Sequence, residues 1–305
     1  MAKIYITGDC HGEFKKIERF CCQYKTSFED VMIILGDAGI NFGFDRWDQN
    51  KKVLLSKKEI TFFCIHGNHE ARPQTIGSYK QKTWHGGVVY YEEEYPNILF
   101  AKDGEFFDLD GKKAIVIGGA YSIDKEWRLM RGAPWFEDEQ PSEEIKEYVE
   151  DRLYEANWKV DYVLSHTAPL KYEPRELFLP GIDQSKVDKS TEEWLSEVEE
   201  KLDYEKWYFG HYHGNKRLGK SEMLFEGIKE LGGDTFLQKV GNPKYRRWQF
   251  VSFVIEQENE KRVLTGEICN IDEYGTFGQY EEVSYDIYGE DGVLYKHIVE
   301  SCVDG

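Results

Sequence analysis

The stretch Lys3-Ile4-Tyr5-Ile6-Thr7-Gly8-Asp9-Cys10-His11-Gly12 joins a strand pattern to a polar loop that is rich in glycine. Residues 3–7 alternate in polarity, which is typical of a β-strand, and the loop supplies an aspartate and a histidine. The same order recurs where residues 31–35 precede Gly36-Asp37 and where residues 60–65 precede Gly67-Asn68-His69-Glu70. Helical spacing between these strands predicts a layered α/β protein whose ligands bind at the carboxyl ends of its strands.

Two later strand patterns end in histidines in the same way. Residues 161–164 precede Ser165-His166, and residues 206–209 precede Gly210-His211-Tyr212-His213. The five loops together hold five of the eight histidines in the chain. Aspartate, asparagine and histidine placed repeatedly at strand ends are the ingredients of a two-metal hydrolytic site. Each motif alone would occur by chance, so the prediction depends on the whole set.

Length and composition narrow the class of protein. A chain of 305 residues has room for one large domain, or for one domain and an appendage. A formal charge of −18 argues against broad binding to nucleic acids or anionic membranes. No apolar run approaches the roughly 20 residues that span a bilayer. The chain starts directly in a strand pattern, and its six cysteines form no CxxC pair, so we expect reduced thiols and a cytoplasmic location.

The ordered motif set resembles the calcineurin-like metallophosphoesterase superfamily over roughly residues 3–220. Residues 118–125 (GGAYSIDK) and Trp135-Phe136, followed by Glu139, further resemble a bacterial and phage branch of it. The resemblance implies an α/β fold in which a sandwich of two β-sheets is flanked by helices. We expect a catalytic domain over residues 1–240. Residues 241–305 would form a small, acidic, β-rich appendage or add strands to the main domain.

The resemblance also implies a site with two divalent metal ions. Asp37 would bridge the ions; Asp9, His11 and His213 would complete one set of ligands, and Asn68, His166 and His211 the other. Mixed oxygen and nitrogen ligands favour Mn²⁺, with Fe, Zn or Ni as alternatives. A metal-bridging hydroxide would attack phosphorus in line, and His69 would donate a proton or hydrogen bond to the leaving oxygen.

Two arginines of the phosphoprotein-phosphatase branch are missing. That branch has GDxxDRG and RGNHE, whereas here Gly36-Asp37 continues as Ala38-Gly39-Ile40 and His66 precedes Gly67. We expect Arg128, or else Arg46, to bind the phosphate, because a guanidinium can do so in a bidentate way. A surface or helix-capping role for these arginines is the alternative. His66 would either face the substrate or pack behind its loop.

The aromatic residues Trp127, Trp135 and Phe136 have two interpretations. They would form a flap that stacks on a base or aryl leaving group, or a hydrophobic cluster that anchors a long loop. The missing arginines favour a phosphodiester or nucleotide-like substrate. The alternatives are a serine/threonine protein phosphatase-like phosphomonoesterase and a metal-bound scaffold whose acidic tail recruits a protein. A phosphate-ester substrate is the expected partner, and the sequence leaves the oligomeric state open.

Overall fold

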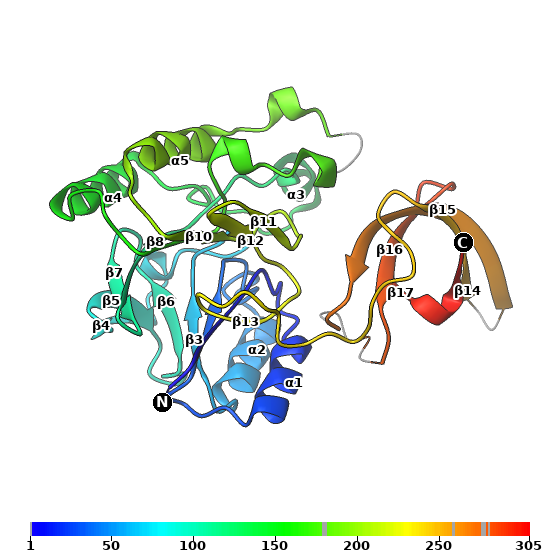
Figure 1. The fold of residues 1–305 in the computed structure, drawn as a ribbon, viewed down its shortest axis with the longest axis horizontal. Helices are drawn as coiled ribbons and strands as arrows, with labels where there is room; N and C mark the ends of the chain where they lie inside the picture. Colours follow the sequence, from blue (N-terminus) through cyan, green and yellow to red (C-terminus); the bar gives the residue numbers. More distant parts are fainter. Residues whose placement is uncertain (1, 179–181, 258–259, 276–278, 280) are drawn as a thin grey trace.

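The computed structural model describes residues 2–178, 182–257, 260–275, 279 and 281–305 (Figure 1). Two mixed β-sheets flanked by helices form the main body, and a separate antiparallel sheet follows at the C-terminus. This architecture confirms the expected α/β sandwich with a small β appendage. Besides the helices and strands given below, the described residues form 3₁₀-helices at Pro73–Thr75, Leu170–Tyr172, Arg175–Leu177, Gln184–Lys186 and Glu300–Cys302.

The first sheet has the strand order β13-β1-β2-β3-β6-β5-β4. Its strands are β1 (Ile4–Thr7), β2 (Val31–Ile34), β3 (Thr61–Cys64), β4 (Lys80–Trp84), β5 (Gly87–Tyr91), β6 (Ile98–Ala101) and β13 (Lys229–Glu230). The four strands β1, β2, β3 and β6 run parallel. Thr7 lies opposite Ile34, and Ile34 lies opposite Cys64, so the three strands end at the same level. The loops that carry Asp9, Asp37 and Asn68 therefore leave one edge of the sheet together.

The second sheet has the order β11-β12-β10-β9-β8-β7. Its strands are β7 (Phe106–Leu109), β8 (Lys112–Ile117), β9 (Tyr162–Ser165), β10 (Lys206–Phe209), β11 (Lys216–Leu218) and β12 (Ser221–Met223). Strands β8, β9 and β10 are parallel, and Ile117, Ser165 and Phe209 lie at the same level. The loops with His166 and His211 therefore also leave one common edge.

Apolar side chains fill three layers. The middle layer lies between the sheets, because its cluster joins residues of both, among them Ile33, Phe63, Val116, Leu164 and Tyr208. Outside the first sheet, α1 (Lys15–Tyr24) and α2 (Arg46–Ser56) contribute Ile17, Phe20 and Leu55 to a second cluster. Outside the second sheet, α4 (Glu143–Glu155) and α5 (Ser190–Lys201) contribute Val149, Leu153, Trp194 and Val198. The short α3 (Lys125–Arg131) lies beside the loops described below.

The C-terminal sheet has its own small core. Its order is β17-β16-β15-β14-β18, with β14 (Phe250–Gln257), β15 (Glu260–Asp272), β16 (Ser284–Gly289), β17 (Leu294–Val299) and β18 (Val303–Asp304). Phe253, Ile268, Tyr285 and Val303 are buried within it. Figure 1 shows this sheet beside the main body, joined to it by the chain that follows β13. The boundary between residues 240 and 241 stays a prediction.

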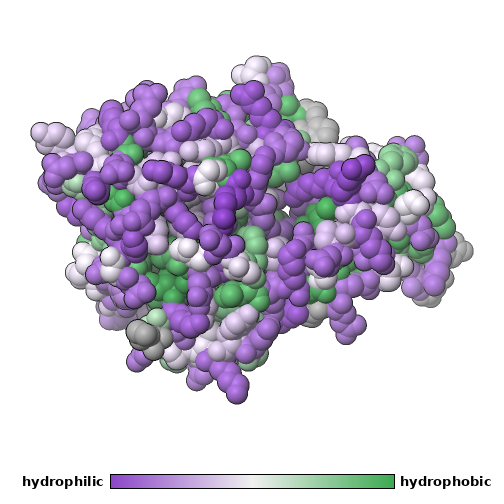
Figure 2. All heavy atoms as spheres, in the orientation of Figure 1, coloured by the Kyte–Doolittle hydropathy of each residue, from purple (hydrophilic) through white to green (hydrophobic). Residues whose placement is uncertain are grey.

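The surface is polar, in keeping with the charge of −18. Hydrophilic residues dominate the face drawn in Figure 2, and hydrophobic ones form small separate groups there. Across the described residues, no helix combines the length and apolarity that crossing a membrane requires.

Glu192 of α5 makes the stability of the fold sensitive to pH. Burial raises the pKa of its carboxyl to about 7, although Thr167 Oγ1 donates a hydrogen bond of 2.7 Å to it. Between the ordinary pKa of 4.5 and this value, the folded protein holds a proton that the unfolded chain releases. The free energy of unfolding should therefore fall as the pH rises through this window, by about 3 kcal/mol in total.

Glu192→Gln should abolish that part of the pH dependence, because an amide does not titrate. Urea unfolding of metal-free protein, measured between about pH 4.5 and about pH 8, would compare the two slopes. Equal slopes in wild type and variant would show that Glu192 titrates normally in the folded state.

Candidate metal centre

Loops from both sheets bring the predicted metal ligands to one place. They follow β1, β2 and β3 in the first sheet and β9 and β10 in the second. The ligating atoms form three overlapping groups, within each of which they lie no more than 4.8 Å apart. These groups are Asp9, His11 and His213; His11, Asp37 and His69; and Asp9, Asp37 and His166.

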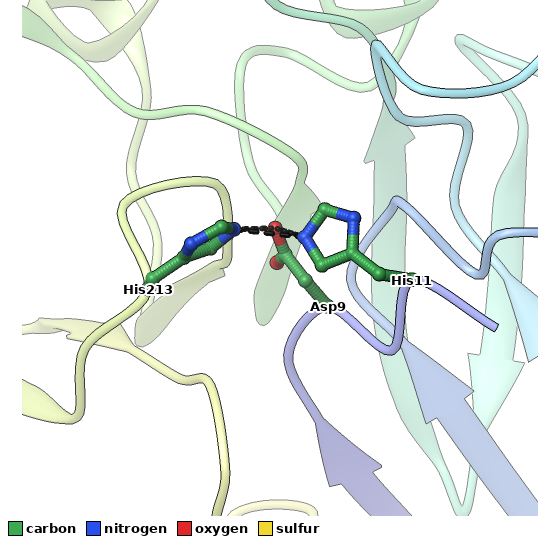
Figure 3. Close-up of side chains that lie close together, drawn as sticks. All are labelled: Asp9, His11 and His213. Carbon is green, nitrogen blue, oxygen red and sulfur yellow. Dashed lines mark hydrogen bonds and ion pairs between the residues drawn. The ribbon is translucent and has the colours of Figure 1, made fainter. Parts of the chain in front are cut away.

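The first group joins Asp9 and His11, from one loop, to His213, which lies 202 residues after His11 in the sequence (Figure 3). His11 Nε2 lies 2.8 Å from His213 Nε2, and Asp9 Oδ2 lies 3.7 and 3.4 Å from these two nitrogens. Asp9 Oδ2 is buried and has no hydrogen-bond partner among the described residues. An orphaned carboxylate oxygen facing two imidazole nitrogens fits a cation with mixed oxygen and nitrogen ligands.

Asp37 occupies the centre of the cluster. Its Oδ2 lies 3.9 Å from His11 Nδ1 and 4.0 Å from His69 Nε2, whereas its Oδ1 lies 3.6 Å from His166 Nε2. Oδ1 also accepts a 2.8 Å hydrogen bond from the backbone N–H of His69. The two oxygens of one buried carboxylate thus face different sets of imidazole nitrogens, an arrangement that allows the carboxylate to bridge two cations.

Asn68 joins two histidines on the other side of Asp37. Its Oδ1 lies 2.8 Å from His166 Nε2 and 3.1 Å from His211 Nδ1. His166 Nδ1 donates to the Leu35 carbonyl oxygen at 2.8 Å, so a neutral His166 presents the lone pair of Nε2 to Asn68. Two acceptors that face each other at this distance fit a shared cation, and the hydrogen bond to Leu35 is the outer contact that orients such a ligand.

Burial and neighbouring charges set the protonation states that metal binding needs. Burial lowers the pKa of both His11 and His211 to about 3. Burial works against ionisation of Asp9, but the neighbouring imidazoles of His213 and His166 outweigh it and lower its pKa to about 2. The pKa of Asp37 also falls below its ordinary range, because His69, His166 and His11 outweigh the effect of burial. Near neutral pH, Asp9 and Asp37 are therefore carboxylates and His11 and His211 are neutral imidazoles, the forms that bind metal ions.

The ligand loops use unusual backbone conformations. Four predicted ligands have a positive φ, a region that few residues other than glycine occupy: His11 (49°), Asp37 (48°), His211 (66°) and His213 (51°). Two glycines admit the close approach of these loops. A Cβ on Gly36 would lie 2.0 Å from His166 Nδ1, and one on Gly67 would lie 2.1 Å from Asp37 Oδ1.

His69 and Arg128 lie together at the edge of the cluster. Nη2 of Arg128 is 2.6 Å from each ring nitrogen of His69, and Arg128 Nε pairs with Asp124 at 2.9 Å. Burial lowers the pKa of His69; Asp37 opposes this shift and Arg128 adds to it. The His69 side chain is 28% exposed, that of His213 is 47% exposed and that of His166 is fully buried, so an incoming substrate can reach His69.

The structure places the two other predicted substrate-binding residues elsewhere. Arg46 is exposed in the first turn of α2, and none of the contacts among the described residues joins it to the cluster. His66 is buried and lines a separate cavity of about 190 Å³ together with Arg72 and Tyr148.

Sequence reasoning missed the role of Phe42 and Phe44. The Phe42 ring stacks towards His69 with centroids 6.3 Å apart, and Phe136 contacts both phenylalanines at the same distance. Phe136 is therefore connected to His69 through Phe42, whereas Trp135 packs under Lys125 and Trp127 is 54% exposed. The sequence held one indication of this placement, because Phe42 follows the predicted ligand Asp37 by only five residues in the same loop.

The C-terminal sheet reaches the last ligand loop. Nη2 of Arg247, which precedes β14, donates to the carbonyl oxygen of His213 at 3.3 Å. The same nitrogen donates to Asn270 Oδ1 of β15. The side chain of Arg247 thus joins the appendage to the backbone of a predicted ligand.

Comparison with known proteins gives the family. The family model for calcineurin-like phosphoesterases matches residues 2–215. Among solved structures, TT1561 of Thermus thermophilus is 14% identical with a TM-score of 0.43, and the match covers 74% of this chain and 90% of that one. Phosphopantetheinyl hydrolase (PptH) from Mycobacterium tuberculosis is 12% identical with a TM-score of 0.40, and the match covers 73% and 89%. No curated protein is significantly similar in sequence. Because the family model matches more than half of the chain, the chain belongs to the calcineurin-like phosphoesterase family and is a hydrolase of phosphoester bonds.

Proposed function

We propose that this phosphoesterase works with two divalent cations, preferably Mn²⁺, held on either side of Asp37. Asp9, His11 and His213 would hold one ion, and Asn68, His166 and His211 the other. The observation that supports this most is the division of the Asp37 oxygens between the two sets of neighbours. When bound, the ions supply an acidified water and neutralise charge on the phosphate oxygens.

His69 would serve the leaving group. His69 follows Asn68 in the sequence, and its partly exposed side chain lies beside the predicted ligands. The His69 Nε2 atom is 4.0 Å from Asp37 Oδ2. From there a ring N–H can donate a hydrogen bond or a proton to the departing oxygen. Because His69 also lies within ligand distance of Asp37, the metal content of a His69 variant distinguishes a proton donor from a ligand.

Arg128 would bind the phosphate in place of the missing arginines. It is buried, its guanidinium is beside His69, and its pairing with Asp124 fixes the direction of the side chain. Phosphate oxygens are strong partners for such a guanidinium. Arg46 and His66 are left out of this proposal, because one is exposed on α2 and the other is buried in the separate cavity.

The phenylalanines beside His69 favour an aromatic leaving group. Phe136 contacts both Phe42 and Phe44, the Phe42 ring stacks towards the His69 ring that would assist departure, and Phe44 is 58% exposed. Exposed aromatic surface next to a reactive group is suited to stacking on a nucleobase or aryl ring. Together with the absence of the two phosphatase arginines, this aromatic surface leads us to propose a phosphodiester or a nucleotide-like ester as the substrate.

Parallel assays on an aryl phosphodiester and an aryl phosphomonoester with Mn²⁺ test this choice. We expect kcat/KM to favour the diester by about tenfold or more, which corresponds to about 1.4 kcal/mol. In Phe42→Ala, the loss of stacking should lower kcat/KM for the diester by about tenfold. Tyr154→Ala, which removes an exposed ring of α4, is the matched control. A tenfold preference for the monoester would favour the phosphomonoesterase alternative instead.

A further inference from the structure

A chain of buried hydrogen bonds lies behind Asn68. The Asn68 Nδ2 amide donates to Ser122 Oγ at 2.9 Å, and Ser122 Oγ donates to Glu139 Oε2 at 2.6 Å. The backbone N–H of Ser122 donates to the other carboxylate oxygen, Oε1, at 3.0 Å. The three residues are at most 2% exposed, so water does not compete for these bonds.

The direction of these bonds is determined by their last member. A carboxylate only accepts hydrogen bonds, so both the N–H and the hydroxyl of Ser122 must donate to Glu139. Because the hydroxyl hydrogen of Ser122 points to Glu139, only the lone pairs of Ser122 Oγ are available to Asn68. It can accept from the amide nitrogen of Asn68 but cannot donate to its oxygen. The Asn68 Oδ1 atom must therefore face the opposite way, towards His166 and His211.

We propose that Ser122 and Glu139 are positioning residues that fix the Asn68 amide with its oxygen towards the metal site. The role rests on the proposed function, because it concerns Asn68 as a ligand. An unrestrained amide can turn by half a rotation and present its NH₂ group, which cannot bind a cation. Ser122 and Glu139 both follow β8, in the stretch that the hydrogen bonds described above hold behind Asn68.

Two substitutions act on the chain of bonds in different ways. Ser122→Ala removes the acceptor for the Asn68 amide and leaves its orientation unrestrained. Glu139→Gln reverses the direction. The glutamine oxygen would accept from the backbone N–H of Ser122, and its NH₂ would donate to Ser122 Oγ. The Ser122 hydroxyl would then donate to Asn68 and favour the flipped amide.

Calorimetric titration of metal-free protein with Mn²⁺ tests the proposal. Wild type should bind two ions, and each variant should weaken one of the two binding events by about 10–100-fold while leaving the other unchanged. Ser122→Thr, which retains the hydroxyl, should keep both events. Ser284→Ala, which changes a buried serine of β16, is the control for loss of a buried hydroxyl. The proposal is overturned if Ser122→Ala and Glu139→Gln bind both ions as wild type does, or if they weaken both events equally.

A second readout separates this proposal from the proposed function. In metal-free wild type, the side-chain NH₂ of Asn68 should exchange its hydrogens slowly by NMR, and in Ser122→Ala about tenfold or more faster, since a buried hydrogen bond is lost. If wild type binds fewer than two ions, the two-metal function fails, and the exchange rates alone decide whether Ser122 holds the amide. Equal exchange rates would overturn the positioning role while leaving a two-ion wild type intact.

Discussion

In the His69→Ala variant, kcat for the aryl diester is expected to fall by about 10²–10⁴-fold, the usual contribution of a positioned proton donor. The bound metal should stay as in wild type, because His69 is proposed to act on the leaving oxygen. Single-turnover rates and elemental analysis of the same samples measure the two quantities. The second measurement matters because the His69 ring also lies within ligand distance of His11 and Asp37.

His85→Ala is the matched control, since His85 is an exposed turn residue whose Nδ1 bonds to the Asp108 carbonyl oxygen. It should leave both turnover and metal content unchanged. Loss of metal together with turnover in His69→Ala would identify His69 as a ligand. Unchanged turnover would exclude it from the reaction.

Asp37→Asn should lower kcat by about 10³-fold or more, because metal ions supply several kcal/mol of charge stabilisation and the bridging carboxylate would be lost. Asparagine is chosen because it tolerates the positive φ of this position, so the backbone is preserved. Elemental analysis should show a loss of bound metal that parallels the loss of activity. Circular dichroism would confirm that the fold is intact.

Asp161→Asn is the control, since this aspartate accepts the backbone N–H of Lys113 at 2.7 Å and is remote from the predicted ligands. It should keep both metal and activity. If Asp37→Asn lost its metal and yet retained wild-type turnover, the two-metal mechanism would be wrong.

The clustering of the predicted ligands could be foreseen because it depends on a regular feature of the fold. Parallel strands that end at one level, such as β1, β2 and β3, bring the residues after them together wherever they lie in the sequence. The polarity pattern predicted those strands. The resemblance to a known family then identified the motifs that follow them, in their order along the chain, as parts of one metal site. The family and the two-sheet sandwich could therefore be predicted from the amino-acid sequence.

Other contacts depend on side-chain packing that no local pattern encodes. Ser122 and Glu139 are 17 residues apart, and their bond forms because the segment between them folds back over Asn68. The approach of Phe136 to Phe42 has the same origin. In the appendage, the sequence predicted a β-rich character but not every individual strand, whereas the described residues form a sheet of five, because short strands such as β18 depend on the partner with which they pair.

The left-handed backbone conformation of four predicted ligands lowers the stability of the folded protein. These residues are His11, Asp37, His211 and His213. Each such residue costs about 1–2 kcal/mol relative to ordinary backbone, and glycine or asparagine would relieve much of that cost. Selection for stability alone would therefore replace these predicted ligands, so we expect their retention to depend on selection for activity. An effort to make the protein more heat-resistant should leave these four positions unaltered, since the substitutions that stabilise the backbone most would also remove predicted metal ligands.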